Sequence, residues 1–360
     1  MKKALAIVLS LAMALCLLTA CGGNTDTSTT AAPANTTAAP NNSSAADNTT
    51  AAGTTANWPA GKNVRYIMTA SAGGGLDICA RILQPYWEKA IGDGTTVTVE
   101  NLTGGANWNG WNEMFKATPD GMTVSNIHTP QVFAYLNKSL QNTNNLDSFN
   151  LLCNCVTDSV TFVVRADDDR FKDVNDLKDL VEYLKASDKE FLVALTSKGG
   201  ADELAMLELM DQTGLTNLVG VNHSDGISAQ KASFLGKDCD IYIGKVGDSL
   251  PLYNDGTVKI LAVCKNDRSL SLPDVPTAKE LGYNLVFGSS RGIATQPGVP
   301  ADVKEAMLET LRKATQDPEY LPKMAEGGYE VDFMEGEAYY QYMKEQEAII
   351  IKYADVLGYN

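Results

Sequence analysis

The chain has 360 residues, of which 44% are hydrophobic, and its 29 basic and 44 acidic side chains give a formal net charge of −15. This acidic balance argues against nucleic acid as a partner, because phosphate binding needs a basic surface. It does not exclude a small anionic ligand, since surface charge is screened over roughly 8–10 Å and local donors then decide.

The N-terminus has the features of a secretory signal. Lys2 and Lys3 precede an apolar run over residues 4–18, which is shorter than the ~20 residues of a membrane span. The run ends in the stretch LTAC, which resembles a bacterial lipobox. The resemblance implies that residues 1–20 are a signal peptide and that Cys21 carries lipid on the outer side of a membrane. A plain signal peptide or an uncleaved anchor is the alternative.

A low-complexity segment follows Cys21. Residues 22–57 contain no Val, Ile, Leu, Met, aromatic or basic residue. Such a segment cannot bury apolar surface, so residues 21–57 are predicted to be a lipidated cysteine and a disordered linker. The composition of a globular protein begins at Trp58, and no later apolar run is long enough to cross a membrane.

The first globular elements enclose a glycine turn. The apolar run Val64–Met68 is followed by TASAGGGLDICAR, after which apolar residues recur on one face of a helix. A strand, a glycine turn and a helix are therefore predicted, with Pro85 kinking the helix or ending it early. Backbone N–H groups at a helix N-terminus attract negative charge, so this turn is a candidate anion site.

Further strands and helices alternate along the chain, which predicts an α/β fold with a largely parallel sheet. The other predicted strands are Val97–Glu100, Thr123–Asn126, Val160–Val164, Leu192–Leu195, Leu218–Val221, Asp240–Ile243 and Val258–Val263. The predicted helices are Asp77–Trp87, Val174–Ala186, Asp202–Gln212, Gly226–Leu235, Val303–Thr315 and Gly336–Leu357.

Cysteine and histidine usage argues against disulfides and metals. Five cysteines remain beyond Cys21, an odd number at scattered spacings, and they are predicted to be buried free thiols. The two histidines, His128 and His223, lie far apart without partners at ligand spacing. We therefore expect no metal and no cofactor.

Several motifs together resemble one family of receptors. AGGGLDICAR, VENLTGGANWNG, ATPDGMT, TSKGGADELA, ILAVCKNDRSLSLPDVPTAKELG and GIATQPGVPADV occur in this order. They are similar to the ligand loops and conserved turns of the Bug-type solute receptors that serve tripartite tricarboxylate transporters. The similarity covers residues 64–358, and LPDVPT is its most specific piece.

The resemblance implies a two-lobed type II periplasmic-binding-protein fold, with hinge strands between the lobes. Lobe one would comprise residues 58–157 plus 287–360, and lobe two residues 158–286. The hinge crossings would lie at Leu151–Cys155 and Leu285–Gly288.

The same resemblance assigns candidate ligand contacts to the first loop. Ser71, Ala72, Gly73 and Gly74 would present backbone N–H groups, and Ser71 its hydroxyl, to a ligand carboxylate. The alternative is a tight turn without a ligand. Asp77 would either cap the helix or accept a hydrogen bond from a ligand.

A second loop and one arginine complete the predicted site. The turn before the helix at residue 202 contributes Ser197, Lys198, Gly199, Gly200, Ala201 and Asp202. Lys198 would either pair with a second carboxylate or point to solvent. Arg291 would hold a carboxylate through its guanidinium fork, or form a structural ion pair instead.

Three more residues are candidates for the pocket. Trp108 and Trp111 would either pack in the core or form a wall of the pocket, and Thr129 is a candidate donor.

The leading functional hypothesis is a receptor, not an enzyme, that binds a small organic carboxylate and delivers it to membrane permease subunits. We expect it to act as a monomer. One alternative is a ligand-binding sensor of the same fold. Another is a hydrolase that uses Ser71 or Ser197 as nucleophile, although no GxSxG motif is present.

Overall fold

The computed structural model describes residues 57–223 and 225–359. The predicted signal peptide, Cys21 and the linker up to residue 56 lie outside the described residues. Within the described part, no helix is both long enough and apolar enough to cross a membrane.

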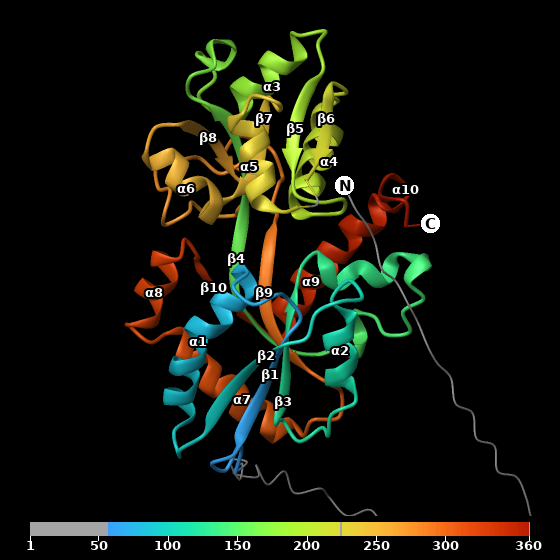
Figure 1. The fold of residues 1–360 in the computed structure, drawn as a ribbon, viewed down its shortest axis with the longest axis vertical. Helices are drawn as coiled ribbons and strands as arrows, with labels where there is room; N and C mark the ends of the chain where they lie inside the picture. Colours follow the sequence, from blue (N-terminus) through green and yellow to red (C-terminus); the bar gives the residue numbers. More distant parts are fainter. Residues whose placement is uncertain (1–56, 224, 360) are drawn as a thin grey trace, which may run out of the picture. The chain divides into compact units, whose positions relative to one another are not determined.

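Lobe one, as we use the name from here, consists of the elements in the lower half of Figure 1, together with the C-terminal helix α10, which lies higher in that view. Its strands β1, β2 and β3 are parallel neighbours, and β9 runs antiparallel to β3. The strands are β1 (Asn63–Met68), β2 (Thr96–Asn101), β3 (Thr123–His128), β9 (Gly288–Thr295) and β10 (Val331–Glu335). The helices are α1 (Gly75–Ile91), α2 (Trp108–Phe115), α7 (Ala301–Thr315), α8 (Tyr320–Glu326), α9 (Gly336–Lys352) and α10 (Ala354–Leu357).

Lobe two consists of the elements in the upper half of Figure 1. Its central strand β5 is parallel to both neighbours, β6 and β7. The strands are β5 (Phe191–Leu195), β6 (Leu218–Asn222), β7 (Ile241–Lys245) and β8 (Val258–Val263), and the helices are α3 (Leu177–Lys185), α4 (Ala201–Thr213), α5 (Ile227–Leu235) and α6 (Val246–Asn254).

Short 3₁₀ helices cover Gln131–Leu136, Lys138–Leu140, Leu146–Ser148 and Asp169–Phe171.

The strand β4 (Asn150–Arg165) runs from lobe one into lobe two, and the chain returns to lobe one through β9, which lies beside β4 (Figure 1). Strand β4 pairs antiparallel with β9 as far as Ser159, and with β7 and β8 of lobe two from Val160 or Thr161 onward. The expectation of a largely parallel sheet is therefore wrong, because parallel pairs occur only within each lobe and every pair that β4 forms is antiparallel. The two sheets are joined into one mixed ten-stranded sheet.

The position at which β4 changes partners bears on the hinge. Residues 151–155 pair with β9 and partly with β10, inside lobe one. The predicted crossing at Leu151–Cys155 is therefore too early, since the exchange of partners occurs between Ser159 and Val160. The other predicted crossing, Leu285–Gly288, immediately precedes β9, where Val160 N donates to Phe287 O at 2.8 Å.

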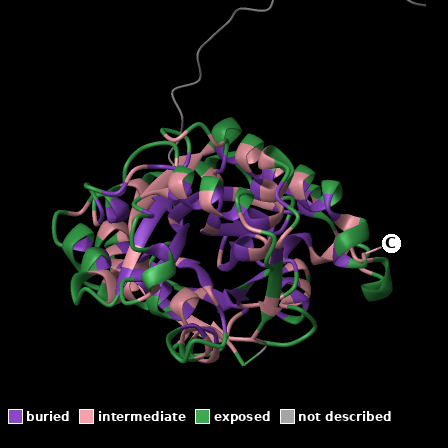
Figure 2. Cartoon of the chain, turned by 90° about the horizontal axis from the view of Figure 1, so that it is seen from above, coloured by how far each residue is buried: buried purple, intermediate pink, exposed green. Residues whose placement is uncertain are grey.

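Buried side chains concentrate on the strands and on the inner helix faces, while exposed residues cover the outer helix surfaces (Figure 2). The five cysteines of the described part are free and buried, as predicted. Pro85 lies inside α1, which continues to Ile91, so the early helix end allowed by the sequence does not occur.

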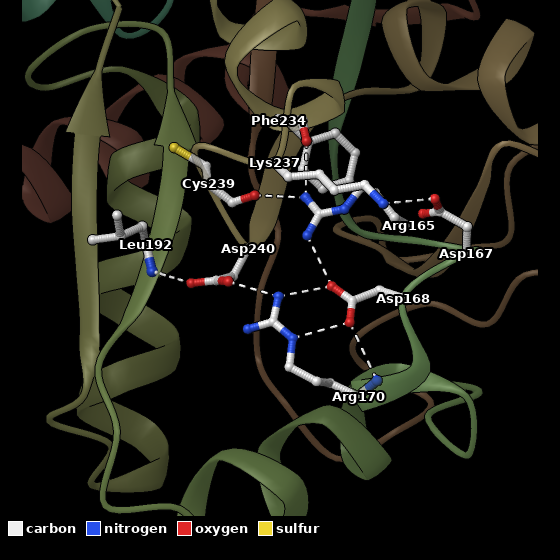
Figure 3. Close-up of polar contacts among 9 residues, drawn as sticks. All are labelled: Arg165, Asp167, Asp168, Arg170, Leu192, Phe234, Lys237, Cys239 and Asp240. Atoms are coloured by element: carbon white, nitrogen blue, oxygen red, sulfur yellow. Dashed lines mark hydrogen bonds and ion pairs between the residues drawn. The ribbon is translucent and has the colours of Figure 1, made fainter.

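The far end of β4 is fixed by a buried arginine (Figure 3). Arg165 Nη1 donates to the carbonyl oxygens of Phe234 at 2.8 Å and Cys239 at 2.6 Å, and Nη2 donates to Asp168 Oδ2 at 2.8 Å. Asp168 also accepts from Arg170, which pairs in turn with Asp240. Arg170 chiefly lowers the pKa of Asp168 to about 2. This network ties the end of β4 to the strand and helices around it.

Candidate functional site

A cavity of about 410 Å³ lies between lobe one and lobe two. Residues of both lobes line it, as expected for a ligand site enclosed by two lobes. Its lining consists of Gly75, Leu76, Asn107, His128, Gln131, Asp158, Ile227, Lys245, Gly247, Asp248, Ser289, Arg291, Gly327 and Tyr329.

Three helices begin at this cavity. Gly75 and Leu76 are the first residues of α1, Ile227 is the first of α5, and Gly247 and Asp248 lie in the first turn of α6. The first N–H groups of a helix have no partner within the helix, and the helix dipole makes this end partially positive. The cavity is therefore suited to bind an anionic group through backbone donors.

Three polar side chains come from adjacent strands on the lobe-one side. Register places His128 of β3 opposite Arg291 of β9, and Asp158 of β4 diagonally across from Arg291. All three are largely buried, and all three line the cavity. The strand pairing thus assembles a site from positions 128, 158 and 291 of the chain.

Arg291 is the best-connected of these residues. Its Nη2 donates to Asp158 Oδ2 at 2.7 Å, and its Nη1 donates to Cys79 Sγ at 2.9 Å and Gly75 O at 3.3 Å. The guanidinium stacks on the Tyr329 ring, 4.6 Å from its centroid. Arg291 Nε and Asp158 Oδ1 are buried without a hydrogen-bond partner. Both interpretations of Arg291, as a structural ion pair and as a ligand contact, are therefore supported, because it pairs with Asp158 and also lines the cavity.

His128 is held as the neutral imidazole. Thr69 N donates to Asn126 Oδ1 at 2.7 Å, which fixes the amide so that Asn126 Nδ2 donates to His128 Nδ1 at 2.9 Å. Nδ1 is then the acceptor, and the proton lies on Nε2. Burial, and secondarily the charge of Arg291, lowers the pKa of His128 to about 3.

Lobe two contributes one cation and one acid that the sequence analysis missed. Lys245 ends β7, and Asp248 lies in the first turn of α6. Burial raises the pKa of Asp248, and the negative charge of Asp158 adds to the effect. The available signal was their position, because polar residues between a strand end and the following helix are common ligand contacts in α/β proteins.

The first glycine loop lies next to this cavity, but the N–H groups of two of its four predicted donor residues are otherwise engaged. Gly73 N donates to Asp77 Oδ2 at 2.8 Å, and Gly74 N donates to Ser71 O at 3.2 Å. Neither they nor the exposed Ser71 and Ala72 line the cavity. The glycines build the turn, and the backbone that faces the cavity begins one residue later, at Gly75.

Asp77 holds the turn before α1, although the N-cap of the helix is Gly74 and has no side-chain cap. Its Oδ2 accepts from Gly73 N and from Arg81 Nε at 2.9 Å, and its Oδ1 accepts from Asn101 Nδ2 at 2.9 Å. The carboxylate is buried and both oxygens are occupied, so the alternative of ligand binding is not supported.

The second loop lines a different, smaller cavity of about 170 Å³. Ser197, Lys198 and Gly199 face Gln131 and Tyr359 there, and Gln131 also lines the larger cavity.

The remaining residues of that loop form the start of α4. Gly200 is the N-cap of the helix, and Ala201 is buried. Asp202 accepts from Thr196 N at 2.5 Å and from Thr196 Oγ1 at 2.9 Å. The structure thus gives Gly200, Ala201 and Asp202 structural roles.

Thr129 and the two tryptophans do not line the main cavity. Thr129 Oγ1 is buried and accepts from Ser290 N at 3.0 Å. Trp108 and Trp111 are 2% and 0% exposed and pack on each other, with ring centroids 5.1 Å apart. Core packing is therefore the correct alternative for both tryptophans.

The two lobes contact one another beside the cavity. A Cβ built on Gly247 of lobe two would lie 3.1 Å from Gly328 O of lobe one, so the backbones approach closely here. Glu330 of lobe one also binds Lys265 and Ser269 of lobe two.

The described residues show little that resembles catalytic machinery. No hydrogen bond joins Ser71 or Ser197 to a histidine in this part of the chain, and none of its His, Cys, Asp and Glu side chains gather in a set of three that could hold a metal ion.

Comparison with known proteins identifies the family. The model of the tripartite tricarboxylate transporter family receptor matches residues 79–354. A relative from Cupriavidus necator, the UPF0065 protein in the gbd 5' region, is 25% identical over 299 residues, which cover 80% of this chain and 86% of that protein.

Solved structures share the fold. A TctC solute-binding protein from Polaromonas, crystallised without ligand, has a TM-score of 0.72 at 22% identity and covers 82% of this chain and 99% of its own. MatC from Rhodopseudomonas palustris with bound malate has a TM-score of 0.61 at 20% identity, covering 82% and 99%. A second R. palustris protein, with adipate, has a TM-score of 0.65 at 18% identity, covering 84% and 98%. The chain therefore belongs to the tripartite tricarboxylate transporter family of receptors, which are extracytoplasmic solute-binding proteins and not enzymes.

Proposed function

We propose that this receptor binds a small organic carboxylate in the 410 Å³ cavity and delivers it to membrane permease subunits of a tripartite tricarboxylate transporter. The observation that carries the proposal is the convergence of three helix N-termini, from both lobes, on one cavity between the lobes. Bound malate and adipate in two structural relatives support the ligand class. A sensor of the same fold would bind its ligand in the same way.

We propose a revised set of ligand contacts. The backbone of Gly75 and Leu76 takes the place of Ser71 to Gly74, and Arg291 is retained from the sequence-based set. His128, Asp158, Lys245 and Asp248 are added because they line the cavity. Ser197 and Lys198 would act only on a ligand that extends past Gln131 into the smaller cavity.

We propose lobe boundaries after residue 159, where β4 changes partners, and before residue 287; the first replaces the boundary after residue 157 expected from the sequence. Contacts of the ligand with both lobes would stabilise the closed arrangement over an open one.

A thermal-shift screen against di- and tricarboxylates, aromatic acids and acidic amino acids tests the ligand class. A ligand present at 100 times its Kd stabilises the native state by about 2.7 kcal/mol. Any hit should also reduce the radius of gyration in small-angle scattering. A screen in which no carboxylate raises the melting temperature would refute the proposal.

Lipid on Cys21 is the proposed anchor. Cys21→Ser should move the protein from the membrane fraction to the soluble fraction after cell lysis. A variant that still sediments with membranes would show that the lipobox interpretation is wrong.

A further inference from the structure

The charges that line the cavity are balanced. Arg291 and Lys245 are cations, and Asp158 and Asp248 are carboxylates. A receptor site for a plain dicarboxylate would be expected to carry an excess of positive charge, since two ligand charges leave water on binding. This cavity instead offers groups of both signs.

Asp158 is only partly satisfied. Its Oδ2 accepts from Arg291, while its Oδ1 is buried without a partner, and the side chain is 95% buried. Buried polar atoms in native proteins are nearly always hydrogen-bonded, so an orphaned carboxylate oxygen beside a ligand cavity indicates a missing donor. None of the hydrogen bonds within the described residues reaches this Oδ1.

Asp248 provides the second acidic group, from the opposite lobe. No ion pair or hydrogen bond of its carboxylate occurs within the described residues, although Lys245 and Lys231 lie near enough to lower its pKa in part. Burial and Asp158 outweigh them and raise the pKa of Asp248. Neutralisation of this carboxylate by a bound cation would relieve the same unfavourable burial.

We infer that the ligand carries a protonated amine as well as a carboxylate, with the amine bound between Asp158 and Asp248 and the carboxylate at the helix N-termini. This inference rests on the proposed function, because it names the chemical class of the carboxylate. An ammonium group donates three hydrogen bonds, which suits two carboxylates on opposite sides of a cavity. The ligand would also bridge the lobes, because β4 and α6 each contribute one of the acids.

Matched ligand pairs isolate the contribution of the amine. L-glutamate and glutarate, and L-aspartate and succinate, differ only by the ammonium group. Calorimetric titration of the purified protein should show tighter binding of the better amino acid than of its deaminated partner, by about ten-fold or more. If glutarate and succinate bind as tightly as the amino acids, the inference is overturned while the proposed function stands.

The wider carboxylate screen extends the same test. Every hit is expected to contain a basic nitrogen, so a set of hits without one overturns the inference. If no carboxylate of either kind binds, the proposed function fails, and the inference fails with it.

Asp248→Asn tests the residue. It removes the charge and keeps the shape, so the preference for the amino ligand should fall to about two- or three-fold, with the affinity for the deaminated partner unchanged or increased. Asp274→Asn is the matched control, because Asp274 is an exposed acid of the same lobe that does not line the cavity. An unchanged preference in Asp248→Asn, with native melting behaviour, would contradict the assignment.

Discussion

Two buried arginines of this receptor share three features of their contacts and differ in the rest. Arg165 and Arg291 each pair with an aspartate through Nη2, stack on an aromatic ring and leave Nε without a partner. Around Arg165, two backbone carbonyls complete the fork, and a second arginine shares the aspartate. Around Arg291 there is a thiol, one carbonyl and a cavity.

The difference shows how one residue pair serves structure in one place and binding in another. The Asp168 carboxylate is saturated by donors of the chain itself, whereas Asp158 retains an unpartnered oxygen. A saturated pair has no capacity for a ligand, and its loss affects only folding. An unsaturated pair at a cavity costs stability in the free protein, and a ligand can offset that cost.

The largest expected effect is on the structural pair. Arg165→Met would leave the carbonyl oxygens of Phe234 and Cys239 without this donor and would remove one hydrogen-bond partner of Asp168. Breaking a buried ion pair in this way costs about 3–5 kcal/mol of unfolding free energy. Urea unfolding measures the loss, and calorimetry on the folded fraction should give an unchanged ligand Kd. A Kd that weakens in parallel with stability would erase the distinction between the two arginines.

The cavity pair should show the reverse pattern. Arg291→Met removes donors to Asp158 and to the cavity, and ligand affinity should fall about 10- to 100-fold, as for the loss of a hydrogen bond to a charged group. Unfolding free energy should fall less than in Arg165→Met, because Arg291 donates to one backbone carbonyl and Arg165 to two. Equal losses of stability in the two variants would contradict the comparison.

The glycine loop gives a related test of where the site lies. A Cβ on Gly75 would lie 3.1 Å from Tyr329 Oη and 3.4 Å from Arg291 Nη2, so Gly75→Val places a branched side chain in the cavity. Overpacking of this kind costs about 1–3 kcal/mol, here as lost affinity measured by calorimetry. Ala72→Val, on the exposed part of the loop, should bind normally. If Ala72→Val loses binding and Gly75→Val does not, the sequence-based site at residues 71–74 is the better one.

Much of the fold was predictable because its signals are local. Alternating apolar runs and glycine turns predicted eight strands and six helical regions, although the predicted strand Val160–Val164 covers only the last part of β4. Strands β9 and β10 were missed, since β9 contains Ser, Arg and Gly and lacks a long apolar run. Its place in the sheet depends on pairing with β4, more than 120 residues earlier, which no local pattern encodes.

The site was less predictable for the same physical reason. Arg291 was identified because it follows the expected hinge crossing, but its partner Asp158 lies in a long strand of mixed polar and apolar composition. Asp158 and Arg165 are the charged residues of this strand, and no local pattern distinguishes the one at the cavity from the one in the core. Register then determines which side chains meet, and this placed His128 and Asp158 beside Arg291.

Acid should distinguish the two regions by the pH at which each loses stability. The pKa of His128 is lowered from 6.5 to about 3, so the unfolded chain binds a proton that the folded chain does not over this range. Its contribution is fully present above pH 6.5 and is lost as pH falls towards 3, at up to about 1.4 kcal/mol per pH unit.

The contribution of Asp168 to stability is lost only at lower pH. Its pKa is lowered from 3.8 to about 2, so its contribution is present above pH 3.8 and is lost as pH falls towards 2. Urea unfolding at pH 7, 6, 5 and 4.5 should therefore show a slope that His128→Asn flattens and Asp168→Asn retains. A slope that survives in His128→Asn would assign it to other groups.

The smallest expected effect comes from the aromatic rings under the two arginines. Tyr329 stacks on Arg291 and lines the cavity, while Phe234 stacks on Arg165 and is fully buried. Tyr329→Leu removes a cation–π contact at a partly solvated site, which is worth about 0.5–1 kcal/mol. Ligand Kd should therefore rise about two- to five-fold, with little change in the unfolding free energy. Phe234→Leu should do the opposite, lowering stability through the volume it vacates in the core and leaving Kd unchanged. Both variants remove a cation–π contact with an arginine. If Tyr329→Leu and Phe234→Leu have the same effects on Kd and on stability, the ligand does not bind in the cavity around Arg291.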